Sequence, residues 1–155
     1  MIKGKQSIAF KASPYIEESA SVVGKKEGEG PLGSRFDMVG LDDMFGEDTW
    51  EKAESSMQKE VCQLALGKAH LTAGAIRYLF GGDLLRQGVA TSLGVEQLQI
   101  PMFGLYGACS TSGEALALAS MCVAAGYRRL PEPYMRPYSA NPSSHNPQSY
   151  RPSLR

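Results

Sequence analysis

Cys109 is the residue with the clearest chemical potential, because it lies where an expected strand turns into an expected helix. The apolar stretch 100–106 predicts a buried strand, and the alanine- and leucine-rich stretch that follows predicts a buried helix ending at Gly126. A helix N-terminus carries free N–H groups and partial positive charge, which make a thiol there a better nucleophile. Gly107 and Ala108 are small neighbours that would leave room for a ligand. We therefore predict a ligand-binding turn at Gly107, Cys109 and Ser110, with Cys109 as its nucleophile.

A structural interpretation of the same cysteine stays open. Free cysteine is among the most often buried residue types and packs like a small hydrophobic side chain. The two histidines of the chain, His70 and His145, have no sequence context that would direct either of them to Cys109 as a general base.

Composition limits the classes of function. The 155 residues carry a net charge of zero, which argues against a large nucleic-acid-binding surface. The three cysteines are an odd number without paired spacing, which favours a reducing compartment over a disulfide framework. The start of the chain does not resemble a signal peptide, and the longest apolar run is too short to cross a bilayer, so a soluble protein is expected.

Two further motifs predict surface loops and no cofactor site. Residues 28–33 match the G-x-G-x-x-G pattern, but they follow a charged stretch and contain Pro31, so nucleotide binding is not expected. Asp42, Asp43 and Asp83 lack the spacing of a metal site, and each is expected in a solvated loop. We predict neither a metal nor a cofactor.

The pattern of residues 1–126 predicts an α/β domain with a mainly parallel sheet. Weak strands are expected over 7–10 and 20–24, a further strand over 76–80, and a helical or loop segment over 87–98. A long helix should begin at a capping box formed by Asp48 and Glu51 and end near Lys68. Thr111 and Glu114 resemble a second capping box.

Residues 127–155 differ in composition from the rest of the chain. They hold six of the nine prolines and five arginines, and they contain no valine, isoleucine or phenylalanine. Recurrent proline prevents a helix and disfavours a central strand. We predict a disordered or extended tail outside the core.

Several blocks in series resemble the stage V sporulation protein AD family. The resemblance covers about residues 3–126, and its blocks are GKKEGEGPLG at 24–33, DDMFG at 42–46, TW at 49–50, MQKE at 57–60, GDLL at 82–85 and FGLYGACST at 103–111. The resemblance implies a thiolase-like (condensing-enzyme) fold, of which this chain would hold an incomplete N-terminal half. In true condensing enzymes the cysteine at the position of Cys109 carries an acyl group.

The resemblance also implies a function that composition could not reveal. Members of the family are expected to bind dipicolinic acid and to help move it, with calcium, into the forespore, together with membrane proteins of the same locus. It implies a protein of the cytoplasm or forespore held at the spore inner membrane through partners, with a homodimer as a further expectation and no established enzymatic activity. An acyl-transferring enzyme of the condensing type, with Cys109 as nucleophile, is the alternative.

The resemblance is expected to stop near Gly126, where the proline-rich composition begins. The abrupt change resembles a reading-frame shift or a truncated gene product, which would make this chain an inactive or partial fragment. The helix after Cys109 would then lack the layers that should cover it, and its apolar surface would be exposed.

Overall fold

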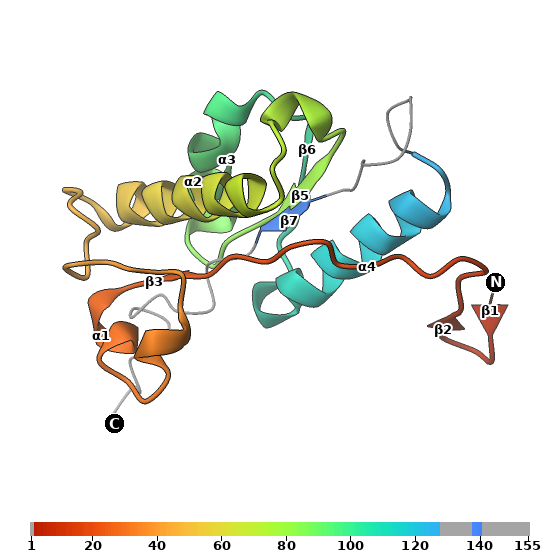
Figure 1. Ribbon diagram of the computed structural model, residues 1–155, viewed down its shortest axis with the longest axis horizontal. Helices are drawn as coiled ribbons and strands as arrows, with labels where there is room; N and C mark the ends of the chain where they lie inside the picture. Colours follow the sequence, from red (N-terminus) through yellow and green to blue (C-terminus); the bar gives the residue numbers. More distant parts are fainter. Residues whose placement is uncertain (1, 128–137, 141–155) are drawn as a thin grey trace.

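The computed structural model describes residues 2–127 and 138–140, and these form an α/β structure (Figure 1). The main sheet is parallel, with β5 (Leu79–Gly81) between β6 (Met102–Gly104) and β7 (Tyr138–Ala140). In its register Leu79 is opposite Met102 and Tyr138, and Phe80 is opposite Phe103. The predicted α/β class with parallel strands is therefore confirmed at this coarse level.

Two smaller strand pairs precede the main sheet. The antiparallel pair joins β1 (Ile2–Lys3) and β2 (Ser7–Ile8), and the parallel pair joins β3 (Val22–Val23) and β4 (Met38–Val39). Between β3 and β4 lie α1 (Lys25–Gly28) and a 3₁₀ turn, Gly33–Arg35. The glycine-rich stretch 28–33 therefore runs as a turn of exposed and half-buried residues between two short helical segments.

Helices cover both faces of the main sheet (Figure 1). The long helix α2 (Trp50–Lys68) packs with α3 (Val89–Val95) on one side, and α4 (Thr111–Ala124) packs on the other. The alternation of side chains along β5 explains both contacts: Leu79 joins the core under α2 and α3, whereas Phe80 packs against Ala115 and Ala119 of α4.

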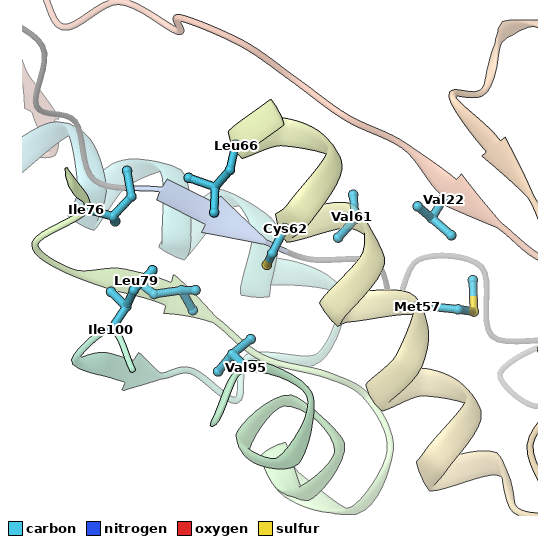
Figure 2. Close-up of a cluster of buried hydrophobic side chains, with 9 residues drawn as sticks. All are labelled: Val22, Met57, Val61, Cys62, Leu66, Ile76, Leu79, Val95 and Ile100. Carbon is cyan, nitrogen blue, oxygen red and sulfur yellow. The ribbon is translucent and has the colours of Figure 1, made fainter. Parts of the chain in front are cut away.

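The larger core cluster gathers residues that are far apart in the sequence (Figure 2). Apolar positions of α2 recur at helical spacing and face β3, β5 and α3. The buried members are Val22, Met57, Val61, Cys62, Leu66, Ile76, Leu79, Val95 and Ile100.

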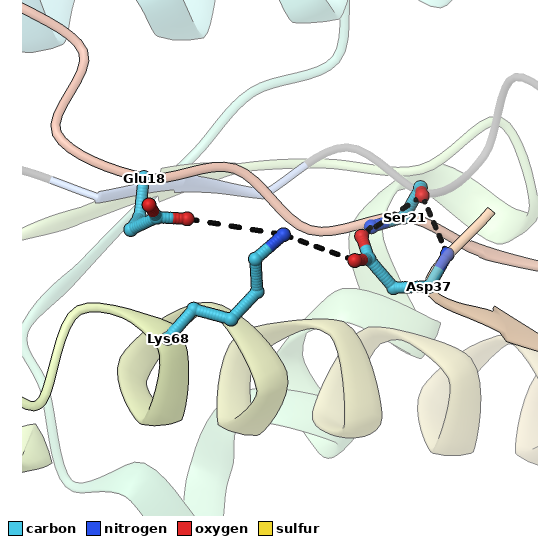
Figure 3. Close-up of polar contacts among 4 residues, drawn as sticks. All are labelled: Glu18, Ser21, Asp37 and Lys68. Atoms are coloured by element: carbon cyan, nitrogen blue, oxygen red, sulfur yellow. Dashed lines mark hydrogen bonds and ion pairs between the residues drawn. The ribbon is translucent and has the colours of Figure 1, made fainter. Parts of the chain in front are cut away.

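Polar contacts attach the N-terminal segment to the end of α2 (Figure 3). The Asp37 carboxylate accepts hydrogen bonds from the Ser21 N–H at 2.8 Å and from the Ser21 hydroxyl at 3.1 Å. The Lys68 ammonium lies 2.9 Å from Asp37 Oδ1 and 3.8 Å from Glu18 Oε2. The hydrogen bond from Lys68, followed by that from the Ser21 backbone, holds the pKa of Asp37 below its ordinary value.

The helix ends partly correct the predictions from sequence. The α2 helix ends at Lys68 as predicted, but its N-cap is Thr49, whose hydroxyl accepts from the Lys52 N–H at 3.3 Å, while Asp48 pairs with the Lys52 side chain instead. The predicted stop of α4 at Gly126 is confirmed. Gly126 has φ +78°, and its N–H donates a hydrogen bond to the Val123 carbonyl oxygen at 3.0 Å.

The stretch predicted as a tail supplies one strand of the main sheet. Residues 138–140 form β7 and pair with β5 along its full length. Three extended residues suffice to complete a parallel ladder, and they fall between Pro137 and Pro142, so no proline has to donate within the strand. The remainder of the predicted tail, 128–137 and 141–155, lies outside the described residues.

Candidate functional site

The turn that carries Cys109 connects β6 to α4, as the sequence predicts. Residues Ala108–Ser110 form one turn of 3₁₀ helix directly before Thr111, the first residue of α4. The thiol of Cys109 is exposed, whereas Cys62 is fully buried in α2 and Cys122 is half-buried in α4. Of the three thiols, Cys109 is therefore the one placed to meet a ligand or a reagent.

The strand that leads into this turn is not buried, which corrects the prediction for 100–106. The strand β6 spans only Met102–Gly104 and lies at the edge of the three-stranded sheet. Phe103 is half exposed, and its ring stacks on Phe80 with centroids 5.0 Å apart. The apolar run predicted a strand correctly, but composition could not reveal its place at the edge.

Local hydrogen bonds fix the shape of the turn. The Gly107 N–H donates to the Thr111 hydroxyl at 3.0 Å, and the Ser110 N–H donates back to the Gly107 carbonyl at 3.0 Å. The single proton of the Ser110 hydroxyl faces two acceptors, that same carbonyl at 2.7 Å and the Glu114 carboxylate. Ala108 adopts φ +50°, a left-handed conformation that costs free energy for a residue with a Cβ. These bonds hold Cys109 in a defined position.

On the side where a Cβ would point, the space beside Gly107 is filled by side chains of the same turn. A Cβ on Gly107 would overlap the Glu114 carboxylate and the Ser110 hydroxyl. A Cβ on Gly82, after β5, would overlap the Leu105 carbonyl oxygen just before the turn. Both glycines therefore permit close packing of the chain around the turn.

Glu114 places a carboxylate at the start of α4. Its Oε1 bonds with the Ser110 hydroxyl, and the N-cap residue of α4 is Ser110 and not the predicted Thr111. A carboxylate in the first turn of a helix compensates the positive end of the helix dipole. Glu114 is also the sole charged residue between Ile100 and Gly126. The turn therefore offers a thiol, a hydroxyl and a carboxylate, but no cation of its own.

The histidines do not complete a catalytic pair within the described residues. His70 is exposed and follows the C-terminal end of α2, and His145 lies outside the described residues. Within 2–127 and 138–140, no group of three His, Cys, Asp or Glu side chains could hold a metal ion. Over the same ranges, no helix is both long and apolar enough to span a membrane.

The helix after Cys109 buries one face and exposes the others. Thr111, Ala115 and Ala119 lie on the buried face, whereas Leu116 and Met121 are exposed. The prediction that this helix would be buried on most sides is therefore wrong for the described residues, and the expectation of an exposed apolar surface is confirmed. Small residues on the inner face allow α4 to approach β5 closely.

Asp83 is a structural residue that sequence reasoning placed wrongly in a solvated loop. Its carboxylate is fully buried and accepts from the Gly88 N–H at 3.0 Å and from the Thr91 N–H and hydroxyl at 2.8 and 2.6 Å. The signal that could have located it is an aspartate shortly before a helix start, where free N–H groups need acceptors. Asp83 thereby fixes the start of α3 to the end of β5.

Comparison with known proteins identifies the family. The sequence model for stage V sporulation protein AD matches residues 4–147. The chain belongs to the stage V sporulation protein AD family. It is 37% identical over 129 residues to stage V sporulation protein AD of Bacillus subtilis (strain 168). The match to the stage V sporulation protein AD family continues past Gly126, where the resemblance was expected to stop, and it includes β7.

The aligned residues make up most of this chain but a much smaller share of the Bacillus subtilis relative. The 129 residues are 83% of this chain and 38% of the Bacillus subtilis protein, so this member of the family spans well under half of that relative's length.

Proposed function

We propose that this chain takes part in spore formation as a dipicolinate-binding member of the stage V sporulation protein AD family. The observation that carries the proposal is the family match over residues 4–147, which includes the exposed turn with Cys109. In this proposal the protein works in the forespore, at the inner membrane, with membrane proteins of the same locus that take up dipicolinate and calcium.

The proposed fold is the N-terminal part of a thiolase-like architecture. A parallel sheet with helices on both faces, and a cysteine turn between β6 and α4, supports this assignment. The exposed apolar side chains of α4, Leu116, Leu118 and Met121, support a surface that further chain, or a second copy, would cover. A pocket of the longer relative would also draw on parts beyond the 129 aligned residues.

The charges near the cysteine turn also indicate that the turn is only one part of a dipicolinate site. Dipicolinate is a pyridine ring with two carboxylates, so its tight binding requires cations or several N–H donors. The stretch from Ile100 to Gly126 contains Glu114 and no basic residue. We therefore infer that the turn at Gly107, Cys109 and Ser110 forms one wall of the site and that cationic groups come from outside this stretch.

Isothermal calorimetry with dipicolinate tests the proposal on two proteins, the full-length Bacillus subtilis relative and this chain. We expect saturable binding by the relative and much weaker or no binding by this chain. No binding by the full-length relative would contradict the function. Equally tight binding by residues 1–155 would show that the parts of the relative beyond the aligned residues are not needed for the site, and it would leave the ligand correct.

A second candidate function is acyl transfer with Cys109 as the nucleophile. The observation that favours it is the exposed thiol directly before the start of α4. Such chemistry also needs a general base and an oxyanion site. Incubation with acyl-CoA, followed by intact mass, would reveal an acyl adduct that Cys109→Ser abolishes and Cys122→Ser retains. An unmodified wild-type chain would exclude acyl transfer under those conditions.

A further inference from the structure

A buried polar cluster lies between α2 and α3, away from the cysteine turn. Glu54 and Gln58 stand one turn apart on α2, and their exposed fractions are 4% and 0%. Asp83, after β5, and Thr91, on α3, are also fully buried and bonded to each other. Charged or polar groups at such depth are normally bonded at every atom.

One atom of the cluster has no partner. The Gln58 amide donates from Nε2 to Glu54 Oε1 at 3.1 Å, but Gln58 Oε1 is buried and accepts nothing. An unsatisfied buried acceptor costs free energy, and the neighbouring Glu54 can supply a donor only in its protonated form.

The surroundings of Glu54 favour that protonated form. Burial is the largest cause that raises the pKa of Glu54, the hydrogen bond from Gln58 opposes it, and the negative charge of Asp83 raises it further. Both carboxyl oxygens of Asp83 accept hydrogen bonds, one from Gly88 and two from Thr91.

Among the described side chains, no cation from the elements packed against Glu54 lowers its pKa. The α3 helix, from Val89 to Val95, contains no ionisable residue, and neither does β3. Arg86, which precedes α3, is paired with Glu51 at 2.7 Å.

We propose that Glu54 stays protonated and that its O–H donates a hydrogen bond to Gln58 Oε1. The two side chains then form a reciprocal acid–amide pair, and deprotonation of Glu54 loosens α3 from α2. With the proton present, each side chain donates one hydrogen bond and accepts one. Without it, a second carboxylate stands beside Asp83, and Gln58 Oε1 again lacks a donor. The device is a proton-sensitive switch in the packing of the two helices.

Close packing gives this switch a route to the cysteine turn. At Gly94 of α3, a Cβ would lie 2.6 Å from the Ser55 carbonyl oxygen, so α3 has little freedom to shift while it stays on α2. Asp83 binds the start of α3, and the adjacent Gly82 packs on Leu105, before the turn. A displaced α3 therefore acts on the strand end that supports Cys109.

Urea unfolding as a function of pH tests the proposal with Glu54→Gln and a control, Glu60→Gln, on the same helix. A raised carboxyl pKa stabilises the fold at low pH, and this contribution is lost as pH rises from the ordinary glutamate value through the raised one. The wild-type and Glu60→Gln midpoints should fall over this range, and the Glu54→Gln midpoint should fall less. Equal pH dependence for all three proteins would overturn the proposal.

An infrared measurement keeps the test decisive if Glu54→Gln does not fold. Wild-type protein with isotope-labelled glutamate should show a protonated carboxylic acid C=O band that persists as pH rises above the ordinary pKa of glutamate, where exposed glutamates have lost their protons. The band should vanish in Glu54→Gln if that variant folds, and it should persist in Glu60→Gln. Absence of the band from the wild-type protein would overturn the proposal without any variant.

Discussion

Replacing Asp83 by asparagine should destabilise the chain far more than its small change in size suggests. The carboxylate accepts three hydrogen bonds, one from Gly88 on Oδ1 and two from Thr91 on Oδ2. Asparagine keeps one acceptor oxygen. In its better orientation it retains both bonds from Thr91 but turns its own NH₂ group toward the Gly88 N–H.

The magnitude follows from this count. One hydrogen bond to a charged group is lost, the other two become bonds to a neutral acceptor, and a partly buried N–H is left unpaired. Hydrogen bonds to charged groups contribute about 1.5–3 kcal/mol each, so we expect a loss of about 2–3 kcal/mol in the free energy of unfolding.

Urea denaturation followed by the fluorescence of Trp50, the single tryptophan, measures this loss. With a slope of about 1–3 kcal/mol per molar urea, the midpoint should fall by roughly 0.7–3 M. Asp42→Asn is the matched control, because Asp42 also accepts two N–H groups, from Met44 and Gly46, but lies exposed. Asp83→Asn within about 0.5 kcal/mol of the wild type would refute the reasoning.

Four further substitutions probe other parts of the fold by the same urea assay. Leu79→Ala removes a fully buried side chain under α2 and should cost about 2–5 kcal/mol, and a loss below about 1 kcal/mol would contradict the core assignment. Gly126→Ala, at φ +78°, should cost about 1–2 kcal/mol, whereas Gly113→Ala, inside α4 with open space around it, should stabilise by about 0.5–1 kcal/mol; the same sign for both would contradict the helix end. The lowered pKa of Asp37 stabilises the fold at pH values above the ordinary aspartate pKa, and the wild type loses this stabilisation as pH falls. Lys68→Met should remove the part that comes from Lys68, the largest cause, while the Ser21 hydrogen bonds remain. Unchanged acid stability would show that the pair is not formed.

Features set by local sequence could be predicted, and features set by distant contacts could not. The spacing of apolar residues determined α2 through Lys68, and Gly126 determined the end of α4, because both depend on near neighbours in the chain. The edge position of β6 and the strand β7 depend on which segments pair across the sheet, and composition carries no information on that.

The candidate site shows the same division. The position of Cys109 before a helix followed from the change in hydrophobic pattern at Gly107. The contact of Glu114 with Ser110, and the burial of Asp83, required knowledge of how the turns fold back on themselves. The predicted N-cap of α2 was wrong by one residue, because Thr49 caps the helix where Asp48 was predicted. Short polar side chains at adjacent positions can each accept a hydrogen bond from the first helical N–H groups, so the sequence does not distinguish them.

Competitive alkylation of the three cysteines tests the central claim most directly, that the turn between β6 and α4 presents Cys109 at the surface. Native protein is treated with iodoacetamide at mildly alkaline pH, and the extent of labelling is read by peptide mass. We predict that Cys109 is labelled first, the half-buried Cys122 more slowly, and the buried Cys62 only on unfolding. Labelling of Cys62 as fast as Cys109 under native conditions would contradict the account.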